Sequence, residues 1–490
     1  MARIAFCQDV LVEYMAYMCM APVLKERGHQ VEVFFDPQQR SRRFQDELAK
    51  WKPDVVGFSV LTPSVPWALA TAREVKRELG AVTVFGNVHA MLNPHIVRED
   101  GVDLVCVGEG EPALAELADR VDARAPYHDI PALWCKQGDG IRENPAPSEL
   151  IDLDAMPFHD RAMYDKYAFF RHSRYVRFLI GRGCPFRCSF CSNTNLLDHF
   201  GGTKSYVRKR TPERAIEELE EVVRERKPDH IYLIDEVLWV QNDWLRRFLH
   251  LYRDRIGVPF QANFRFGPIE EDDVRLLAEA GAKTVIFAVE SADERQRREV
   301  FEKPVSNALI EKLAVWLHRY GIRFTANVFF GVAGDSVEDH LARLPFFRRI
   351  APDYLWTSFF QPYPALKLTE RMIEQGLLRT DRPFEHTVHH DMYLDLPDRV
   401  RHVNLKKVYF YMQRWPWTTP LLTWLLRFDA PWLFDLLFLF HFTYYALRFE
   451  RVSFVQFVHH AKVFALNPVL RRLQTLPSTG RSFTPRPAAA

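Results

Sequence analysis

The stretch GRGCPFRCSFCSN at residues 181–193 holds three of the seven cysteines of the chain, Cys184, Cys188 and Cys191, in the spacing C-x3-C-x2-C. Thiolates are strong ligands for soft metals, and clustered cysteines commonly hold an iron–sulfur cluster. A cubane cluster normally takes four thiolates, so three leave one iron without a protein ligand. An open position on a metal is where chemistry takes place. The stretch therefore predicts a reactive iron–sulfur cluster.

Two other interpretations of the cysteines stay open. The spacing i, i+4, i+7 also fits one face of a helix, on which the cysteines would be small buried apolar residues. Gly181, Gly183 and Pro185 are poor in a helix interior and favour a loop, which follows a strand expected over Tyr175–Ile180. A structural zinc site would need a fourth ligand nearby, and the next Cys or His is His199.

With Phe190 directly before the last cysteine, the three cysteines resemble the signature of the radical S-adenosylmethionine (SAM) superfamily. The resemblance implies that they hold a 4Fe–4S cluster whose fourth iron chelates the amino and carboxylate groups of SAM. It also implies reductive cleavage of SAM to a 5′-deoxyadenosyl radical. In such an enzyme the protein supplies orientation and exclusion of water.

The composition suits a globular protein of about two to four domains, with 490 residues that are 48% hydrophobic and 26% charged. The formal net charge of +2 points to no nucleic-acid partner. No secretory signal is evident, and the other cysteines lack the spacing of a disulfide framework, which predicts a cytoplasmic protein. These are Cys7, Cys19, Cys106 and Cys135.

Residues 1–145 are predicted to form a doubly wound parallel sheet of the α/β class, because short apolar strands alternate with helices and Gly-containing turns. The expected strands are Arg3–Cys7, Gln30–Phe35, Asp54–Val60, Val82–Phe85 and Leu104–Val107. The expected helices are Tyr14–Arg27, Ala68–Leu79 and Glu111–Val121. Ligands bind such sheets at the carboxyl ends of the strands, where loops are expected over residues 8–12, 61–66, 86–94 and 108–112.

The segments LKERGH (24–29), PDVVG (53–57), FGNVH (85–89) and VGEGE (107–111) resemble, in this order, the cobalamin-binding domain that precedes radical SAM domains. The resemblance implies that cobalamin contacts residues in the loops at the strand ends. The candidates are Thr62, Ser64, Gly86, Asn87, His89, Gly108, Glu109 and Gly110.

The domain lacks the Asp-x-His-x-x-Gly motif that supplies a histidine to cobalt in many cobalamin proteins. Either cobalamin binds with its lower face covered near Thr62–Val65, which we favour, or the domain has lost the cofactor and acts as a scaffold. We expect His89 to form a hydrogen bond or to pack rather than to bind cobalt.

Residues 146–174 are interpreted as a linker, and residues 175–395 as a radical SAM domain. After Tyr175–Ile180 the expected strands are His230–Asp235, Phe260–Phe266, Thr284–Glu290, Arg323–Phe330 and Tyr354–Gln361. Helices are expected over Thr211–Lys227, Asn242–Arg255, Glu271–Ala280, Asn307–Tyr320 and Ser336–Ile350. This alternation resembles the partial (β/α)6 barrel of the superfamily, in which chemistry lies at the carboxyl ends of the strands.

Polar and special residues gather at those ends. Carboxylates can pair with the SAM ammonium group, and an arginine with its carboxylate. By resemblance, residues 235–236 stand at the amino-group segment, residues 290–291 near ribose and carboxylate, and residues 331–334 against adenine. The candidates for SAM contacts are Phe190, Asp235, Glu236, Arg265, Glu290, Ser291, Asn327, Gly331, Tyr363 and Pro364. Ala365 replaces the glycine that usually follows the Pro-Tyr-Pro element.

Residues 396–477 are predicted to be helical and rich in aromatic side chains, and residues 478–490 to be disordered. The apolar segment 431–447 approaches the length of a membrane span, which needs about 20 residues. The alternatives are a helical cap over the barrel mouth, a contact with a membrane surface or a lipid-like substrate cleft, and a true span.

The sequence thus predicts a cobalamin-dependent radical SAM enzyme, most simply a methyltransferase for a lipid-like or secondary-metabolite substrate. One alternative is radical cyclisation or oxidation without methyl transfer, as in relatives resembling the anaerobic magnesium-protoporphyrin ester cyclase. The other is a cobalamin or cluster sensor, which would not need Asp235, Arg265 and Glu290 to orient SAM. The expected partners are a small-molecule substrate and an external electron donor such as flavodoxin or ferredoxin. The expected location is the cytoplasm, or the periphery of the inner membrane.

Overall fold

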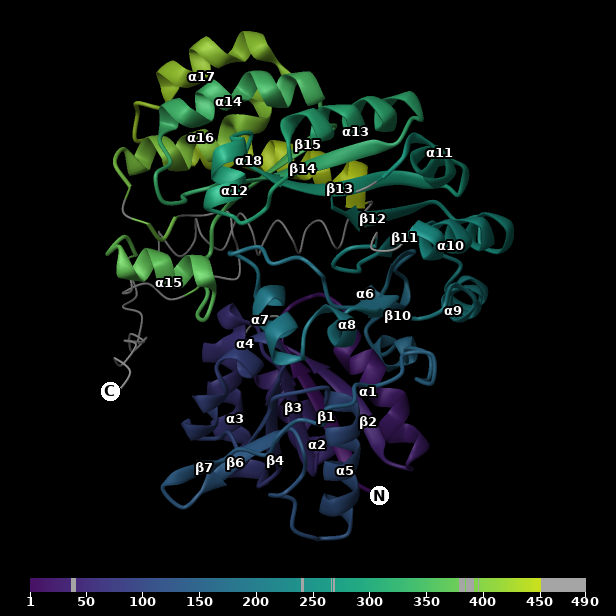
Figure 1. Cartoon of the computed structure of the whole chain (residues 1–490). Coiled ribbons are helices and arrows are strands. Elements are labelled where there is room, and N and C mark those ends of the chain that lie inside the picture. The colour runs from purple at the N-terminus through teal and green to yellow at the C-terminus, as the bar shows by residue number, and fades with distance from the viewer. Residues whose placement is uncertain are drawn as a thin grey trace. The chain divides into compact units, whose positions relative to one another are not determined.

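The computed structural model describes residues 1–36, 41–238, 242–265, 267, 269–378, 384, 392–394 and 396–450. The chain forms two compact units (Figure 1). The first contains Met1–His172 together with Asp198–Tyr206, and the second contains the remaining described residues.

The first unit is built on a seven-stranded sheet in the order β2-β1-β3-β4-β5-β6-β7 (Figure 1). Its strands are β1 (Arg3–Gln8), β2 (Gln30–Phe35), β3 (Val55–Ser59), β4 (Val82–Gly86), β5 (Leu104–Cys106), β6 (Leu133–Gln137) and β7 (Gly140–Arg142). The first five are parallel, which confirms the predicted doubly wound sheet, and β6 and β7 add an antiparallel hairpin. The strand order reverses between β1 and β3, which is the switch point where ligands bind in such folds.

Four of the seven described helices of the first unit have no counterpart in the prediction. The described helices are α1 (Met15–Glu26), α2 (Arg42–Trp51), α3 (Val65–Leu79), α4 (Asn87–Leu92), α5 (Gly110–Asp122), α6 (Ala168–Arg171) and α8 (Thr203–Tyr206), with the short 3-10 turns η1 (Thr62–Ser64), η2 (Pro94–Arg98) and η3 (Arg161–Tyr164). The expected loop over residues 86–94 is wrong, since most of it is the helix α4. A helix of six residues is too short to show a hydrophobic period in the sequence.

The segment expected to be a linker bonds to the first sheet. The hydroxyl of Tyr164 donates to Gln8 Oε1 over 2.6 Å and accepts from the backbone N–H of Tyr14 over 3.0 Å. The hydroxyl of Tyr167 accepts from the N–H of Phe35 over 2.9 Å. These bonds fasten the segment to the ends of β1 and β2.

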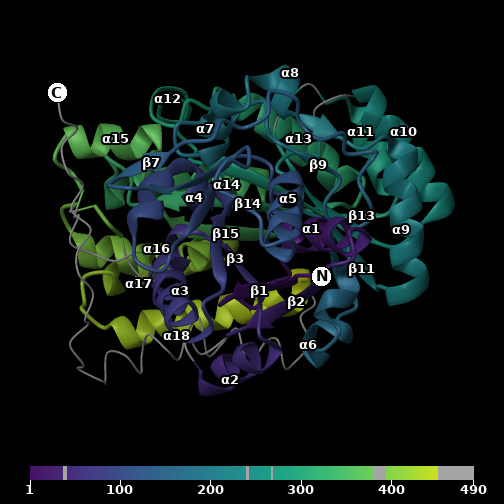
Figure 2. The same cartoon turned by 90° about the horizontal axis from the view of Figure 1, so that it is seen from below.

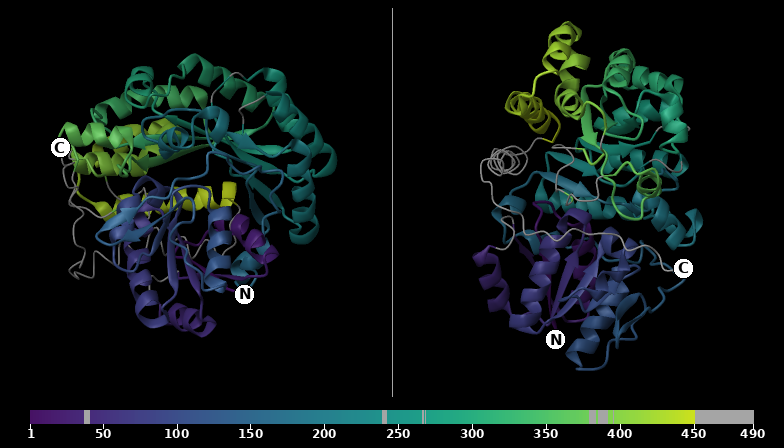
Figure 3. Two further views of the ribbon diagram at one scale, coloured as in Figure 1. Left: turned by 60° about the horizontal axis from the view of Figure 1, so that its bottom comes forward. Right: turned by 90° about the vertical axis from the view of Figure 1, so that its left-hand side faces the viewer.

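The second unit is built on a six-stranded, fully parallel sheet in the order β15-β14-β13-β12-β11-β8. Its strands are β8 (Tyr175–Phe178), β11 (His230–Leu233), β12 (Phe260–Phe264), β13 (Ala282–Glu290), β14 (Arg323–Phe330) and β15 (Tyr354–Phe359). The strands form an open arc with helices on its outer side (Figures 2 and 3). All six predicted strands are confirmed, as is the partial barrel.

The helices that follow these strands begin where the sequence predicts. Thr211 accepts a hydrogen bond from the N–H of Arg214 at the start of α9, and Ser306 and Ser336 cap α13 and α14 in the same way. The helices of the second unit are α7 (Ser192–His199), whose last two residues belong to the first unit, α9 (Pro212–Arg226), α10 (Asn242–Arg255), α11 (Glu271–Glu279), α12 (Glu294–Glu299), α13 (Asn307–Arg319), α14 (Val337–Ile350) and α15 (Lys367–Glu374). A short antiparallel sheet of two strands, β9 (Gly181–Arg182) and β10 (Arg208–Lys209), precedes the cysteine loop at β9.

The tail continues as α16 (Arg399–Arg414), the turn η4 (Pro416–Thr418), α17 (Thr419–Leu425), α18 (Pro431–Tyr445) and the π-helical turn η5 (Ala446–Glu450). α16 packs on α14 and β15, where Tyr409 donates to the carbonyl of His340 over 2.7 Å. α18 packs on the amino-terminal half of β15, where Tyr354 Oη lies 2.7 Å from His441 Nδ1. This is the strand end opposite to the cysteines. α16 packs nearer the carboxyl end of β15, where Thr357 Oγ1 donates to the carbonyl of Lys406 over 3.0 Å. A cap over the barrel mouth stays a prediction.

Among the residues that the structure describes, none of the helices combines the length and apolar character needed to cross a bilayer. Residues 451–490, with the segment predicted to be disordered, lie outside the described residues.

Candidate active site

The three cysteines lie in a loop that is held at its middle by backbone hydrogen bonds. Cys188 is buried, and Cys184 and Cys191 are half-buried. The N–H of Ser189 donates to the carbonyl of Phe301 over 3.0 Å, and its hydroxyl donates to the carbonyl of Val300 over 2.6 Å. Residues 183–191 contain no helix, so the interpretation as a packed helix face is wrong.

The donor set fits an iron–sulfur cluster rather than one metal ion. Within the described residues, no group of three or more His, Cys, Asp or Glu side chains is placed to hold a single ion. Thiolates of a cubane cluster each bind a different iron, so they need not converge on one point. Burial raises the pKa of Cys184 to about 11 and that of Cys191 to about 12, so iron binding has to release their protons.

Arg265, directly after β12, supplies positive charge to the cysteine loop. Its Nη1 donates to Cys188 Sγ over 3.2 Å, and its guanidinium carbon lies 3.5 Å from the centre of the Phe186 ring. A cation beside a thiol favours the thiolate, which is the form that binds iron. The sequence expected Arg265 to pair with the SAM carboxylate, whereas in the structure it contacts a cluster cysteine.

Asp235, two residues after β11, fixes the start of the same loop. Its Oδ2 accepts from the N–H of Ile180 over 3.0 Å, and its Oδ1 accepts from the N–H of Gly181 over 2.7 Å. Burial raises the pKa of Asp235, while Lys209 and these backbone bonds act in the opposite direction. Both carboxylate oxygens of Asp235 thus accept hydrogen bonds from the backbone. A contact between Asp235 and SAM stays a prediction.

Gly181 has no room for a larger residue at this place. A Cβ there would lie 2.5 Å from the carbonyl oxygen of Arg208 and 3.3 Å from Asp235 Oδ1. The neighbouring Glu236 is exposed, and its carboxylate accepts a hydrogen bond from Asn193 of α7. The glycine therefore lets the chain approach Asp235 closely enough to be fixed by it.

Glu290 ends β13 in a strained conformation beside a lysine. Its φ is +65°, which is rare for a residue other than glycine, and the register of β13 against β14 shifts at this point. Its Oε1 lies 3.2 Å from Lys303 Nζ, and both side chains are about 5% exposed or less. Burial raises the pKa of Glu290, and Lys303 and Arg265 counteract that rise.

The sequence did not reveal Lys303, because it lies in a loop with no periodic or motif signal. Its Nζ also donates to the carbonyl of Ala288, so the ammonium group is enclosed by the end of β13. The ion pair brings one predicted residue and one unpredicted residue together at the same strand end.

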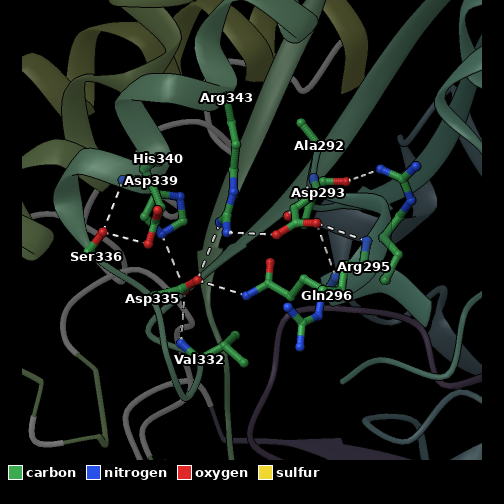
Figure 4. Close-up of polar contacts among 12 residues, drawn as sticks. Ala292, Asp293, Arg295, Gln296, Val332, Asp335, Ser336, Asp339, His340 and Arg343 are labelled. Atoms are coloured by element: carbon green, nitrogen blue, oxygen red, sulfur yellow. Dashed lines mark hydrogen bonds and ion pairs between the residues drawn. The ribbon is translucent and has the colours of Figure 1, made fainter. Parts of the chain in front are cut away.

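A second buried network centres on Asp335, which follows the loop after β14 (Figure 4). Its Oδ2 accepts from the N–H of Val332 over 3.1 Å, and its Oδ1 accepts from Gln296 Nε2 over 2.9 Å. His340 Nε2 lies 3.2 Å from Oδ2, and Arg343 Nη1 lies 3.3 Å from Oδ1. Burial opposes the charge of Asp335, but His340, Arg343 and Gln296 together hold its pKa below the usual value.

The Asp335 network joins α12, α14 and the segment 331–334 that was predicted to lie against adenine. Gly331 has a φ of +70°, and a Cβ there would lie 2.9 Å from the Cβ of Met392. The network was missed because its members are ordinary loop and helix residues in the sequence. The signal that the sequence offers is Asp335 itself, a charged residue directly before Ser336, which caps α14.

The other predicted SAM residues contact neighbours within the second unit. The Phe190 ring packs edge-on against Phe301 and Phe329, with centres 5.4 and 5.1 Å away. Ser291 is buried, and its hydroxyl accepts from the N–H of Asp293. Asn327 on β14 is half-buried, and burial raises the pKa of Tyr363, next to Pro364, to about 12.

In the first unit, neutral hydrogen bonds join the loops after β3 and β4. Thr62 Oγ1 lies 3.0 Å from His89 Nδ1, and Asn87 Nδ2 donates to Ser59 Oγ over 2.9 Å. Burial lowers the pKa of His89 to about 4, so the ring is neutral at ordinary pH. Ser64, in the same loop as Thr62, donates to Asp9 Oδ1 over 3.0 Å.

Two of the predicted cobalamin glycines are required by packing within the unit itself. A Cβ at Gly108 would lie 2.9 Å from that of Ala132, and one at Gly110 would lie 3.0 Å from Met20 Sδ. Glu109, between them, accepts from the N–H of Ile151 over 2.7 Å. Their sequence pattern therefore has a structural cause besides any ligand.

The carboxyl ends of β3 and β4 carry a glycine that packing does not require and an exposed apolar side chain. A Cβ at Gly86 would meet only the Cβ of Cys106, at 3.8 Å. Leu61, just after β3, is 39% exposed at the switch point. An exposed apolar side chain at this strand end is compatible with a large, partly apolar ring such as that of cobalamin.

Two family models match the chain. The B12 binding domain matches residues 12–118, and the Radical SAM superfamily matches residues 178–344. These matches confirm the predicted fold class and the two predicted kinds of domain.

Curated relatives are about 25% identical to the chain over the aligned residues. An uncharacterized methyltransferase of Pyrococcus horikoshii is 25% identical over 342 residues, which is 68% of this chain and 72% of the relative. The anaerobic magnesium-protoporphyrin IX monomethyl ester cyclase of Rubrivivax gelatinosus is 25% identical over 376 residues, covering 73% of this chain and 66% of the relative.

A solved structure shares the fold. It is the radical S-adenosylmethionine methyltransferase TsrM from Kitasatospora setae, with cobalamin and a [4Fe-4S] cluster bound. The TM-score is 0.64 at 17% identity, over 76% of this chain and 75% of that one.

Proposed function

The chain belongs to the radical SAM enzymes that carry a B12-binding domain, and we propose that it transfers a methyl group to an unactivated carbon of a small molecule. The observation that carries the proposal is the loop with Cys184, Cys188 and Cys191, with Arg265 donating to Cys188 at the carboxyl ends of a parallel sheet. When bound, the 4Fe–4S cluster supplies the electron that cleaves SAM, and cobalamin carries the methyl group.

In this proposal the side chains of the chain hold the cysteine loop in place and orient SAM. Arg265 balances the negative charge of the thiolates, and Asp235 fixes the backbone before the first cysteine. Glu290 offers a buried carboxylate for polar groups of SAM, and Lys303 limits the cost of its burial. The Asp335 network holds segment 331–334 in place for the adenine ring. Each of these roles is a proposal.

The substrate class that we propose is lipid-like or a secondary metabolite. Named relatives act on such molecules, among them the Hopanoid C-3 methylase of Methylococcus capsulatus and the Cytidylyl-2-hydroxyethylphosphonate methyltransferase of Streptomyces wedmorensis. The electron would come from an external donor such as flavodoxin or ferredoxin. We place the protein in the cytoplasm, in contact with the inner membrane through its aromatic C-terminal region.

A second candidate is radical cyclisation or oxidation without methyl transfer. It is favoured by the similarity to the cyclase, which reaches the same 25% identity as the methyltransferase. The same cysteines, SAM site and B12-binding domain serve both reactions, so the outcome for the SAM methyl group distinguishes them.

Anaerobic turnover with SAM deuterated in its methyl group tests the proposal. The reconstituted enzyme is incubated with a reductant and fractions of lipids and secondary metabolites, and the products are analysed by mass spectrometry. Deuterium in a product supports methyl transfer, and 5′-deoxyadenosine with an unlabelled product supports cyclisation or oxidation. An absence of 5′-deoxyadenosine would overturn both and leave the sensor. The Cys184→Ala, Cys188→Ala, Cys191→Ala triple variant is the control.

A further inference from the structure

Exposed large apolar side chains are concentrated in the tail. Of the fifteen in the described residues, ten lie between Trp415 and Leu447. The other five are scattered over the chain, at Met1, Leu61, Val315, Ile373 and Val400. Single exposed apolar residues are ordinary, but a dense group marks an interaction surface.

On η4 and α17 the exposed residues form one stripe. Leu421 and Trp424, three residues apart, lie on one face of α17. Trp417 of η4 precedes them by four residues, and Phe428 follows α17, four residues after Trp424. Trp417 is 77% exposed, the highest value among the exposed apolar residues.

A second stripe runs along α18. Trp432, Leu436, Phe440, Tyr444 and Leu447 are exposed at intervals of four, four, four and three residues. The opposite face of α18 is buried against β15 and α16, through residues such as Phe438, His441 and Tyr445. α18 is thus apolar on both sides, although only one side packs against the described residues.

The charges around the two stripes are mainly positive. Arg414, Arg427 and Arg448 are exposed at their ends. Of the acidic residues between Trp415 and Leu447, Asp429 is exposed, and Asp435 pairs with Lys407 of α16. Tryptophan at the boundary and arginine near the headgroups is the composition of a helix that lies in a membrane interface.

We infer that this aromatic surface, made of Trp415, Trp417, Leu421, Trp424, Phe428, Trp432, Leu436, Phe440, Tyr444 and Leu447, binds the surface of a lipid bilayer that contains anionic lipids. α18 has 15 residues and a length of about 22 Å, so it is shorter than the hydrocarbon core of about 30 Å and lies in the plane of the bilayer. The inference deepens the proposed function, because a lipid-like substrate would be reached from that surface. The lipid binding itself needs no catalysis.

Sedimentation with vesicles tests the inference on the full chain. Vesicles of phosphatidylcholine alone and of phosphatidylcholine with phosphatidylglycerol are incubated with the cofactor-loaded protein, and the bound fraction is measured. Binding is expected to be stronger to the anionic vesicles. The variant Trp417→Ser, Trp432→Ser, Phe440→Ser is expected to bind at least about tenfold more weakly, because three large apolar contacts are lost.

Matched variants separate the contribution of the aromatic surface from that of other apolar residues and from that of the positive charges. Val315→Ser with Ile373→Ser removes exposed apolar residues outside the surface and is expected to leave vesicle binding unchanged. Arg414→Gln with Arg427→Gln is expected to reduce the preference for anionic vesicles by about fivefold or more for each charge. The circular dichroism of each variant shows that it folds.

Two outcomes would overturn the inference. One is that the wild-type chain does not sediment with either vesicle. The other is that the serine variant sediments as well as the wild type, or changes only the oligomeric state in light scattering, which would indicate a second copy on the surface. Formation of 5′-deoxyadenosine is measured in parallel without vesicles. If the wild-type protein forms no 5′-deoxyadenosine, the proposed function is refuted. The lipid binding is then judged from the sedimentation result alone.

Discussion

The strand ends of the two parallel sheets are held together by different kinds of polar contact. In the first unit, the bonds that join the loops after β3 and β4 to each other link neutral groups, as between Thr62 and His89. After β13 and β14 of the second unit, they join buried ions, as between Glu290 and Lys303 and around Asp335. The difference follows the expected ligands, since cobalamin presents a large ring and SAM presents an ammonium and a carboxylate.

Buried ions cost more than neutral groups and need partners to be tolerated. An ion without a partner inside a protein is strongly destabilising, whereas a neutral hydrogen bond contributes about 1 kcal/mol. The strand ends after β13 and β14 therefore depend on complete ion pairs, whereas the bonds between the loops after β3 and β4 do not. Substitutions in the two regions should reveal this difference as unequal losses of stability and of cofactor.

The largest effect is expected from the triple variant Cys184→Ala, Cys188→Ala, Cys191→Ala. It should abolish the sulfur-to-iron charge-transfer absorption and all 5′-deoxyadenosine, because every thiolate ligand of the cluster is removed. Cobalamin retention after gel filtration should stay unchanged, since the first unit keeps its own contacts. Cys135→Ala, at a buried cysteine of β6, is the control and should keep the absorption. Persistence of the absorption in the triple variant would contradict the cluster assignment.

The second-largest effect is expected from removing one partner of the buried Glu290–Lys303 pair. Lys303→Met leaves Glu290 buried without its cation and is expected to lower the free energy of unfolding by about 3–5 kcal/mol, measured in urea. The double variant Glu290→Gln, Lys303→Met should recover part of this loss, because the unpaired charge is gone. If the loss of unfolding free energy in the double variant equals the sum of the losses in Glu290→Gln and Lys303→Met alone, the two side chains are not coupled.

Asp335→Asn should cost less, about 2–3 kcal/mol, because the amide can still accept one of the backbone and side-chain bonds. The folded state holds the pKa of Asp335 low, so its contribution is present above the ordinary aspartate pKa of about 4 and is lost as the pH falls below it. The difference between wild type and variant should therefore shrink between about pH 5 and pH 3. Asp339→Asn, which changes the carboxylate beside the Ser336 cap, is the control for the local helix end. A difference that does not depend on pH would contradict the charged role of Asp335.

The sequence predicted those parts of the fold that local patterns encode. The six strands of the second unit, the helices expected over Thr211–Lys227 and Ser336–Ile350 and the cysteine loop follow from periodicity and ligand spacing. The hairpin β6–β7 and the helix α4 did not, because they are short and depend on contacts with distant segments.

The partners of the site residues were the least predictable part. Arg265 is predicted to bind the SAM carboxylate, and its contact with Cys188 could not be read from the sequence, because the two residues are 77 positions apart. Lys303 and Asp335 carry no motif, and their roles appear only when the chain brings them beside Glu290 and segment 331–334. The contacts with SAM and cobalamin stay predictions.

The smallest effect is expected in the first unit. His89→Gln keeps a group that can bond Thr62 Oγ1, so it should cost about 1 kcal/mol at pH 7 and change cobalamin retention by less than about twofold. Burial lowers the pKa of His89 from 6.5 to about 4, so the unfolded chain binds a proton more readily and the wild type loses stability as the pH falls through this range. The variant should lack that part of the pH dependence, so that its deficit narrows between pH 7 and pH 4, as urea unfolding at several pH values would show. Thr62→Val is the matched control for the other end of the bond. A complete loss of cobalamin from His89→Gln alone would mean that the histidine binds cobalt, and the neutral character of the first site would then no longer separate it from the second.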